Sequence, residues 1–538
     1  MSTVSVKGAS PAAAPLPVEL ELGDLQGGIL SAYGKLGFPK ARYILFHVES
    51  AKGGRAFVEA LRPKITTARR WPSSKGISTG TSPVARPDCT LNIAFTFWGL
   101  YALDVPTRTL RGMPDEFIDG MAVRAPILGD DILDNGADHW DEVWKPGQPK
   151  AHILVMLNAR ADADGNALPA LAELTDFVLQ AATANGLTLL QGHKGDDPRW
   201  QDLSAIYAPG ADGKPTPQPT EHFGFVDAIG DPVFEGQYPG GEEKLRSVGQ
   251  GAVDGRGNWR PLAPGEFILG WTDEAQEVAG GAMPLDFSRN GSFFAYRKLH
   301  QHLDAWDQWV GARAKDLAAT WEIGDLPTAI ALLKAKMAGR WPDGVPLLLA
   351  PTPQEHAAFN TRLTPGSKEW LAAITHFGFL DDLDGSKCPV TSHIRRANTR
   401  DMLDPLWDKP VADRMGSALN NRRRILRRGL PYGAAGRTDG EHGIILLAHC
   451  ASLFRQFEFV QQQWMNYGLD FNAGNDSCPI VGTHPPGARF VIAAPDDTKP
   501  PFIASGIPQF VSTRGGEYFF APSMTALRMI GTGVVDPT

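Results

Sequence analysis

Residues 91–98 read LNIAFTFW, and this stretch decides the expected fold class. The strongly apolar side chains at positions 91, 93, 95 and 97 alternate with smaller or polar ones, and a period of two predicts a β-strand. Because only every second side chain is strongly apolar, we expect this strand in a sheet with one covered face.

Three further strands and a helix are predicted around this segment. The strand candidates are residues 41–50 (ARYILFHVES), 152–158 (HILVMLN) and 187–191 (LTLLQ). Between the last two, apolar residues recur at helical spacing over 171–181. Strands that alternate with amphipathic helices in this way indicate an α+β unit.

The second half of the chain shows the same alternation of predicted strands and helices. Its predicted strands are 266–271, 291–297, 443–448 and 517–521, and its predicted helices run through 303–310 and 326–337. The Pro- and Gly-rich segment 209–219 (PGADGKPTPQP) is predicted to be a linker. We therefore expect a disordered tail over 1–20, one domain over 21–215 and a second over 216–538, with loop-rich insertions at 351–385 and 401–422.

Composition excludes several classes of protein. The 538 residues carry a formal net charge of −8, which argues against a nucleic-acid-binding surface. The four cysteines form no CxxC pair, and no P-loop, HExxH or GxSxG motif occurs. No apolar run is long enough to span a bilayer, and the Ala/Pro-rich start does not have the pattern of a secretory signal. We expect a soluble, cytoplasmic protein with no membrane partner.

Three segments carry residues suited to chemistry. In 221–232 (EHFGFVDAIGDP), Asp227 is flanked by apolar residues that would tune its ionisation, although a loop aspartate more often binds backbone N–H groups. In 388–401 (CPVTSHIRRANTRD), His393 lies among arginines that disfavour the imidazolium form and suit an anion such as a propionate. In 422–433 (RRRILRRGLPYG), at least one arginine is expected to point inward. None of the three decides a function alone.

In this order the three segments resemble the dye-decolorizing peroxidases, whose pattern is a GxxDG loop, a haem-binding histidine and an ILRRG-like arginine segment. Other stretches are similar to the family in the same order: 24–35, 258–270, 290–299, 339–346, 455–464, 479–482 and 517–523. The resemblance spans about residues 22–532. It implies two ferredoxin-like α+β domains with antiparallel sheets, of the dimeric α+β barrel-like superfamily, and one haem b in the second domain.

The resemblance also implies roles for single residues. His393 matches the proximal iron ligand, Asp227 the distal acid–base residue and Arg427 the distal arginine, with Arg428 one register away and a second candidate for contact with the cofactor. The implied activity is reduction of H2O2 with oxidation of dyes, phenols or similar small organic reductants. Because a free aspartate titrates near 3.9, we expect an acidic optimum for dye oxidation.

Further residues are assigned around the implied haem. Arg297 and Arg395 are candidates for its propionates, since a planar guanidinium suits a carboxylate. Glu458, or alternatively Asp476, is the expected acceptor for the second nitrogen of His393.

The sequence departs from the family pattern at two positions. Ala228 stands in place of the last motif glycine, and Thr399 stands in place of a proline. An alanine strains the loop if φ at position 228 is positive and is harmless if φ is negative.

Two rival functions stay open at this stage. One is a haem-binding or iron-releasing protein with little turnover, and the other is a haem-free structural domain on the same fold. The sequence leaves the oligomeric state open between monomer and homodimer.

Overall fold

The computed structural model describes residues 18–71, 85–434, 436 and 440–535. Most of the predicted tail, residues 1–17, lies outside the described residues. Within the described part, no helix is both long and apolar enough to cross a bilayer.

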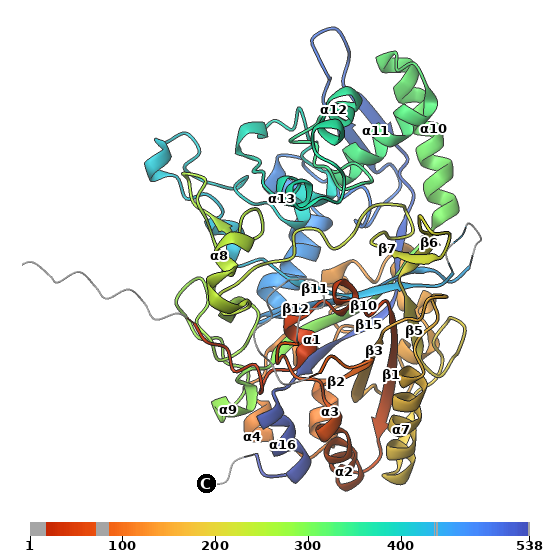
Figure 1. The fold of residues 1–538 in the computed structure, drawn as a ribbon, viewed down its shortest axis with the longest axis vertical. Helices are drawn as coiled ribbons and strands as arrows, with labels where there is room; N and C mark the ends of the chain where they lie inside the picture. Colours follow the sequence, from red (N-terminus) through yellow and green to blue (C-terminus); the bar gives the residue numbers. More distant parts are fainter. Residues whose placement is uncertain (1–17, 72–84, 435, 437–439, 536–538) are drawn as a thin grey trace, which may run out of the picture.

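One nine-stranded antiparallel sheet organises the molecule (Figure 1). Its N-terminal half is built from β1 (Lys40–Val48), β2 (Cys89–Phe95), β3 (Ile153–Ala159), β4 (Leu187–Leu189) and β5 (Gln201–Ser204). Its C-terminal half is built from β10 (Ser292–Gln301), β11 (Leu426–Tyr432), β12 (Gly443–Cys450) and β15 (Val511–Ala521). The halves meet where β15 pairs with β2 at Phe520 and Phe95. Two antiparallel half-sheets with helices confirm the α+β prediction.

Strand β2 is buried on both faces, so the expectation of one covered face is wrong. Asn92 is only 2% exposed. Its amide group is satisfied in the interior, because its N–H donates to Gln26 Oε1 at 3.2 Å and its oxygen accepts from the Tyr33 hydroxyl at 3.0 Å. Gln26 and Tyr33 precede β2 by more than 50 residues. Its polar side chains are therefore satisfied inside the protein rather than by water.

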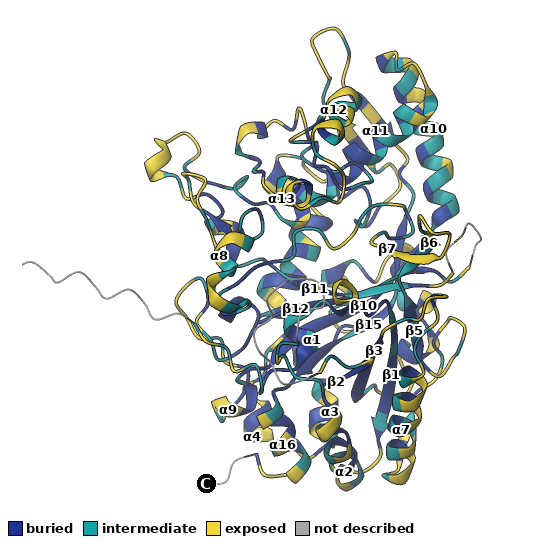
Figure 2. Cartoon of the chain, in the orientation of Figure 1, coloured by how far each residue is buried: buried dark blue, intermediate teal, exposed yellow. Residues whose placement is uncertain are grey.

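Helices α2 (Ala51–Leu61) and α7 (Ala170–Ala184) lie beside the N-terminal half of the sheet. The C-terminal helix α16 (Met524–Thr532) returns to pack beside α2, as the dark-blue helix in Figure 1 shows. In the second half, α10 (Leu303–Trp321) packs against α11 (Leu326–Ala338), and Trp306 of α10 is fully buried in the apolar core there. The outer faces of these helices carry the exposed residues and the inner faces the buried ones (Figure 2).

Three local predictions differ from the structure. Residues 266–271 form no strand; the segment follows the short 3-10 turn Pro264–Glu266, and Glu266 is fully buried in a network of charges. Much of the predicted linker belongs to the hairpin of β6 (Ile206–Pro209) and β7 (Pro215–Gln218). The insertion 351–385 contains α12 (Pro353–Arg362), which begins with a capping box at Thr352, and α13 (Lys368–Ala373).

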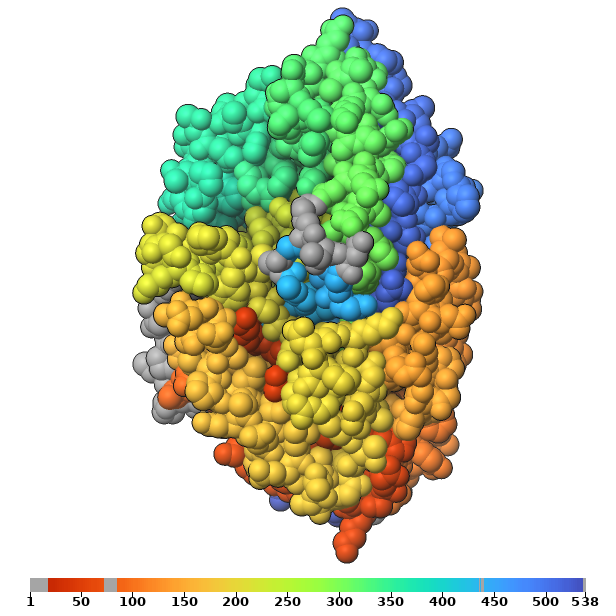
Figure 3. Space-filling view, turned by 90° about the vertical axis from the view of Figure 1, so that its right-hand side faces the viewer, coloured from red at the N-terminus to blue at the C-terminus, as the bar shows by residue number. Residues whose placement is uncertain are grey.

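The remaining elements are short. Two small hairpins pair β8 (Ala252–Val253) with β9 (Trp259–Arg260) and β13 (Arg489–Ile492) with β14 (Phe502–Ser505). The short α-helices are α1 (Gly27–Leu30), α3 (Phe97–Ala102), α4 (Thr107–Leu110), α5 (Asp115–Asp119), α6 (Ala125–Leu128), α8 (Glu243–Arg246), α9 (Leu285–Ser288), α14 (His393–Ala397) and α15 (Ala418–Asn421). Figure 3 shows the light-blue ends of β11 and β12 at the surface, between the yellow segment that contains β6 and β7 and the green helix α10.

Candidate active site

One cavity of about 580 Å³ brings the predicted site residues together. Asp227, His393, Arg297, Arg427 and Arg428 all line it. Apolar side chains supply much of the remaining wall, among them Leu299, Ile425, Leu446, Phe457, Met465 and Val481. An apolar cavity of this size with a few convergent polar groups is typical of a small-molecule or cofactor site.

His393 is the first residue of α14, and its two ring nitrogens have different surroundings. Nδ1 lies 3.4 Å from Sγ of Cys478, and Nε2 makes no hydrogen bond with the described residues. An imidazole whose second nitrogen lacks a protein partner in a cavity is a suitable metal ligand.

Neither carboxylate predicted to accept from His393 does so. Glu458 binds Arg124 at 2.6 Å and accepts from the Tyr518 hydroxyl at 2.8 Å. Asp476 binds Arg489 at 3.3 Å. Both expectations are wrong, because each carboxylate already has a basic partner from another part of the chain.

The loop that carries Asp227 is held at several backbone positions. Glu221 accepts from the N–H groups of Phe223 and Phe225 at 2.8 and 2.9 Å. The N–H of Asp227 itself donates to Pro219 O at 2.7 Å. In its side chain, Oδ1 accepts from the N–H of Ala228 at 2.5 Å, whereas Oδ2 makes no hydrogen bond with the described residues. The loop therefore presents a half-exposed carboxylate with one oxygen still available.

Ala228 has a φ of +62°. This is the case, left open by the sequence, in which an alanine strains the loop. A residue with a Cβ pays a conformational cost in this left-handed region that glycine does not. Of the two departures from the family pattern, this one strains the loop next to Asp227. At the other, Thr399 is fully buried and its hydroxyl has no hydrogen-bond partner among the residues that the structure describes.

We expect Ala228→Gly to raise the free energy of unfolding by about 1 kcal/mol, because glycine removes the left-handed strain. Urea unfolding of the protein measures this change. Gly230 is a matched reciprocal control, since its φ is +75° and a Cβ there would meet no atom within 4 Å. Gly230→Ala should lower the free energy of unfolding by a similar amount. A destabilising Ala228→Gly would contradict the strain argument.

The two candidate arginines, Arg427 and Arg428, are neighbours on strand β11 but have different surroundings. Because side chains alternate along a strand, Arg427 and Arg428 point to opposite faces. Arg427 approaches Asp227 at 3.8 Å and donates to Ile229 O at 2.8 Å. Arg428 is buried, donating to Ile29 O at 2.9 Å and binding Asp231 at 2.9 Å. The geometry therefore couples Arg427, not Arg428, to Asp227.

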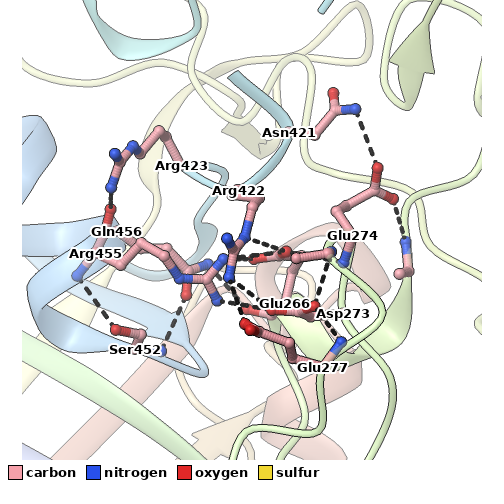
Figure 4. Close-up of polar contacts among 12 residues, drawn as sticks. Glu266, Asp273, Glu274, Glu277, Asn421, Arg422, Arg423, Ser452, Arg455 and Gln456 are labelled. Atoms are coloured by element: carbon pink, nitrogen blue, oxygen red, sulfur yellow. Dashed lines mark hydrogen bonds and ion pairs between the residues drawn. The ribbon is translucent and has the colours of Figure 1, made fainter. Parts of the chain in front are cut away.

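A buried charge network fixes the chain just before β11 (Figure 4). Arg422 binds Asp273 at 3.0 Å, and Arg455 binds Glu266 at 2.9 Å. Burial raises the pKa of Glu266 even though Arg455 opposes the shift. Gln456 donates to the carbonyl of Arg424 at 2.5 Å. These contacts position the start of the strand that carries Arg427, and they explain why 266–271 forms no strand.

The side chain of Asp231 holds the main chain of Arg427, because Asp231 Oδ1 accepts from the Arg427 N–H at 3.2 Å. Burial alone would raise the pKa of Asp231, but Arg428, Lys35 and Arg427 outweigh it and lower the pKa below its ordinary value. A carboxyl with a lowered pKa stabilises the fold above its unfolded pKa of about 3.9, and this contribution is lost as the pH falls through the lower folded value.

We expect Asp231→Asn to destabilise the protein by about 2 kcal/mol at pH 7, since a charge-assisted contact with Arg428 is lost. The difference between variant and parent should shrink as the pH falls below the unfolded pKa of about 3.9 and through the lower folded value, where the parent carboxyl becomes protonated. Urea unfolding at pH 7 and over a series of acidic pH values checks this, and a loss that stays equal throughout would contradict it.

The two arginines predicted for the propionates lie in different settings. Arg297 lines the cavity, but Asp130 forms a close ion pair with it and Thr513 accepts from it at 2.8 Å, so its charge is already compensated. Arg395 does not line the cavity; it is fully buried and pairs with Asp382. The expectation for Arg395 is therefore wrong.

Three other arginines line the cavity and form no ion pair with any described carboxylate: Arg340, Arg400 and Arg424. They donate instead to main-chain carbonyls, as Arg400 does to Thr375 O at 2.9 Å. Burial and the charge of Arg427 lower the pKa of Arg340 to about 10, and burial likewise lowers that of Arg424 to about 10. Cations without counterions beside an apolar cavity favour an anionic ligand there.

These donors fit a haem. His393 offers a ring nitrogen without a protein partner, the apolar wall suits a porphyrin, and the three arginines suit carboxylates. Arg340 and Arg424 were not predicted from the sequence. What distinguishes these two arginines is that they pair with no described carboxylate, and only the folded structure reveals this.

Comparisons with known proteins point to one family of peroxidases. A family model described as the DyP dimeric alpha+beta barrel domain matches residues 24–188. Peroxidase 2 of Mycetinis scorodonius is 27% identical over 97% of this chain and 89% of its own length. A dye-decolorizing peroxidase of Exidia glandulosa is 27% identical over 94% of this chain and 86% of its own length.

Solved structures agree in fold. A dye-decolorizing peroxidase in complex with 2,6-dimethoxyphenol superposes with a TM-score of 0.68 at 23% identity, covering 95% of this chain and all of that one. The enzyme of Auricularia auricula-judae gives a TM-score of 0.67 at 23% identity, over 96% of this chain and all of that one. The chain thus matches the DyP dimeric alpha+beta barrel domain over residues 24–188 and is similar to dye-decolorizing peroxidases along nearly its whole length.

Proposed function

We propose that this peroxidase holds one haem b through His393 and reduces H2O2 with the help of Asp227 and Arg427. The observation that carries the proposal is the shared cavity, which all three side chains line together with three arginines that lack a carboxylate partner. The haem, when bound, supplies the iron that accepts oxidising equivalents from peroxide and passes them to a reductant.

Asp227 is suited to move the peroxide proton. Its Oδ1 is fixed by the N–H of Ala228, and its Oδ2 is available to accept a proton and to return it to the oxygen that leaves as water. The guanidinium of Arg427 lies 3.8 Å from the carboxylate and stabilises negative charge that develops as the O–O bond breaks. The two side chains thus divide proton transfer and charge stabilisation between them.

The reducing substrates we propose are dyes and phenols. Support comes from the relatives, which are named dye-decolorizing peroxidases, and from the solved structure of one with 2,6-dimethoxyphenol. A phenol is the first substrate to test, because one is the ligand in that solved structure.

The test is reconstitution of the purified protein with haem, followed by H2O2-dependent oxidation of 2,6-dimethoxyphenol. We expect a Soret band and steady turnover. A Soret band with negligible turnover would favour the haem-binding or iron-releasing alternative. Absence of the band after reconstitution would refute the proposal.

We propose that the propionates lie against Arg340, Arg400 and Arg424. Arg340→Gln and Arg424→Gln are each expected to weaken haem affinity about 10-fold, the effect of losing about 1.4 kcal/mol of interaction. Titration of the apoprotein with haem, followed at the Soret band, gives the dissociation constants. Arg256→Gln is the matched control, since Arg256 is exposed and does not line the cavity. Unchanged affinity in both cavity variants would argue against this placement.

A further inference from the structure

The sulfur of Cys478 is the hydrogen-bond partner of His393 Nδ1. The two atoms are 3.4 Å apart, within the range of a hydrogen bond to sulfur. Among the described residues no carboxylate contacts His393, because Glu458 and Asp476 are bound to Arg124 and Arg489. The position that would orient the imidazole is therefore occupied by a thiol.

Cys478 is fixed by its own main chain. The residue is fully buried, its N–H donates to Met465 O at 2.7 Å, and its carbonyl accepts from the Gly482 N–H at 3.0 Å. A Cβ on Gly482 would lie only 2.6 Å from that carbonyl oxygen, so the turn depends on the glycine. The sulfur consequently has little freedom to leave His393.

The helix of His393 and the segment of Cys478 are also tied to each other. Arg396, three residues after His393 on α14, donates to Trp464 O at 2.8 Å and to Asp476 O at 2.6 Å. Arg396 is fully buried. Since one guanidinium joins the helix to Trp464 and to Asp476, two residues before Cys478, the distance between Nδ1 and Sγ is set by the fold rather than by a mobile side chain.

We propose that Cys478 is the positioning residue for His393 and that its thiol sets the electron-donating strength of the imidazole toward the haem iron. This inference rests on the proposed function. When Nε2 is the ligand, the ring proton stays on Nδ1 and must be donated, so the sulfur is the acceptor. Sulfur accepts an N–H hydrogen bond more weakly than a carboxylate oxygen does. The imidazole is then less electron-rich than with a carboxylate partner, and the ferric state is stabilised less.

The test measures the Fe(III)/Fe(II) midpoint potential of the haem-loaded protein by spectroelectrochemistry. Relative to the parent, Cys478→Asp should lower the potential and Cys478→Ala should raise it. The Fe–His stretching frequency of the ferrous protein, from resonance Raman spectra, should rise in Cys478→Asp and fall in Cys478→Ala. Cys450→Ser is the control, because Cys450 is equally buried but, unlike Cys478, is not the residue whose sulfur contacts His393.

The outcomes separate this inference from the proposed function. If Cys478→Ala and Cys478→Asp bind haem and both keep the potential and the Fe–His frequency of the parent, the positioning role is refuted and haem ligation by His393 stands. If the buried aspartate prevents folding, the alanine variant alone decides. Retention of an unchanged Soret band in His393→Ala would instead overturn the ligand assignment itself.

Discussion

His393→Ala is expected to lose the Soret band of the reconstituted protein and to weaken haem binding at least about 100-fold. Removal of a residue that merely orients a metal ligand typically costs 10–100-fold, and removal of the ligand itself should cost no less. Haem titration of the variant apoprotein measures the loss directly. Addition of free imidazole should restore part of the band, because a small ligand can occupy the space that the side chain vacates.

His449 provides the control for this prediction. It also lines the cavity, but it is 2% exposed, contacts Ser292 Oγ at 3.3 Å and packs against the ring of Phe294. Burial holds the pKa of His449 well below its ordinary value, so the ring is neutral. We expect His449→Ala to keep the Soret position. If His449→Ala loses the band and His393→Ala keeps it, the iron ligand is His449.

The strands were predictable because their signal is local. The period of two over 91–98 can be recognised without knowing which segments pack against it, and β2 forms there. Whether both faces are covered depends on Gln26 and Tyr33, which belong to a different segment. The wrong strand at 266–271 has the same origin, since Glu266 pairs with Arg455, nearly 190 residues later. Local pattern predicts elements, and long-range polar pairing decides their environment.

The candidate site divides in the same way. The resemblance to a family brought Asp227, His393 and Arg427 together, and the cavity agrees. Glu458 was expected beside His393 by residue type, but Arg124 and Tyr518 bind it. Cys478 had no signal in the sequence beyond its position next to the segment 479–482. The sign of φ at Ala228 was equally beyond the sequence, because it is a property of the folded loop.

Asp227→Asn is expected to slow peroxide reduction by about 10²–10⁴-fold with haem still bound, the usual contribution of a positioned acid–base group. The amide can keep the contact of Oδ1 with the Ala228 N–H, but it cannot accept the peroxide proton. The measurement is the second-order rate constant for H2O2, with Asp254→Asn as the control, because Asp254 is an exposed aspartate in a similar loop contact with a backbone N–H.

Arg427→Gln should cost about 10²–10³-fold in the same rate constant, since one fixed donor to developing charge is lost. Because Arg427 and Asp227 lie 3.8 Å apart and act in one step, the double variant should lose less than the product of the two single losses. Multiplicative losses would show that the two side chains act independently. A normal rate in Arg427→Gln together with a large loss in an Arg428 variant that still binds haem would transfer the role to Arg428. The present geometry argues against that result, because the Arg428 guanidinium is occupied by the carbonyls of α1 and by Asp231.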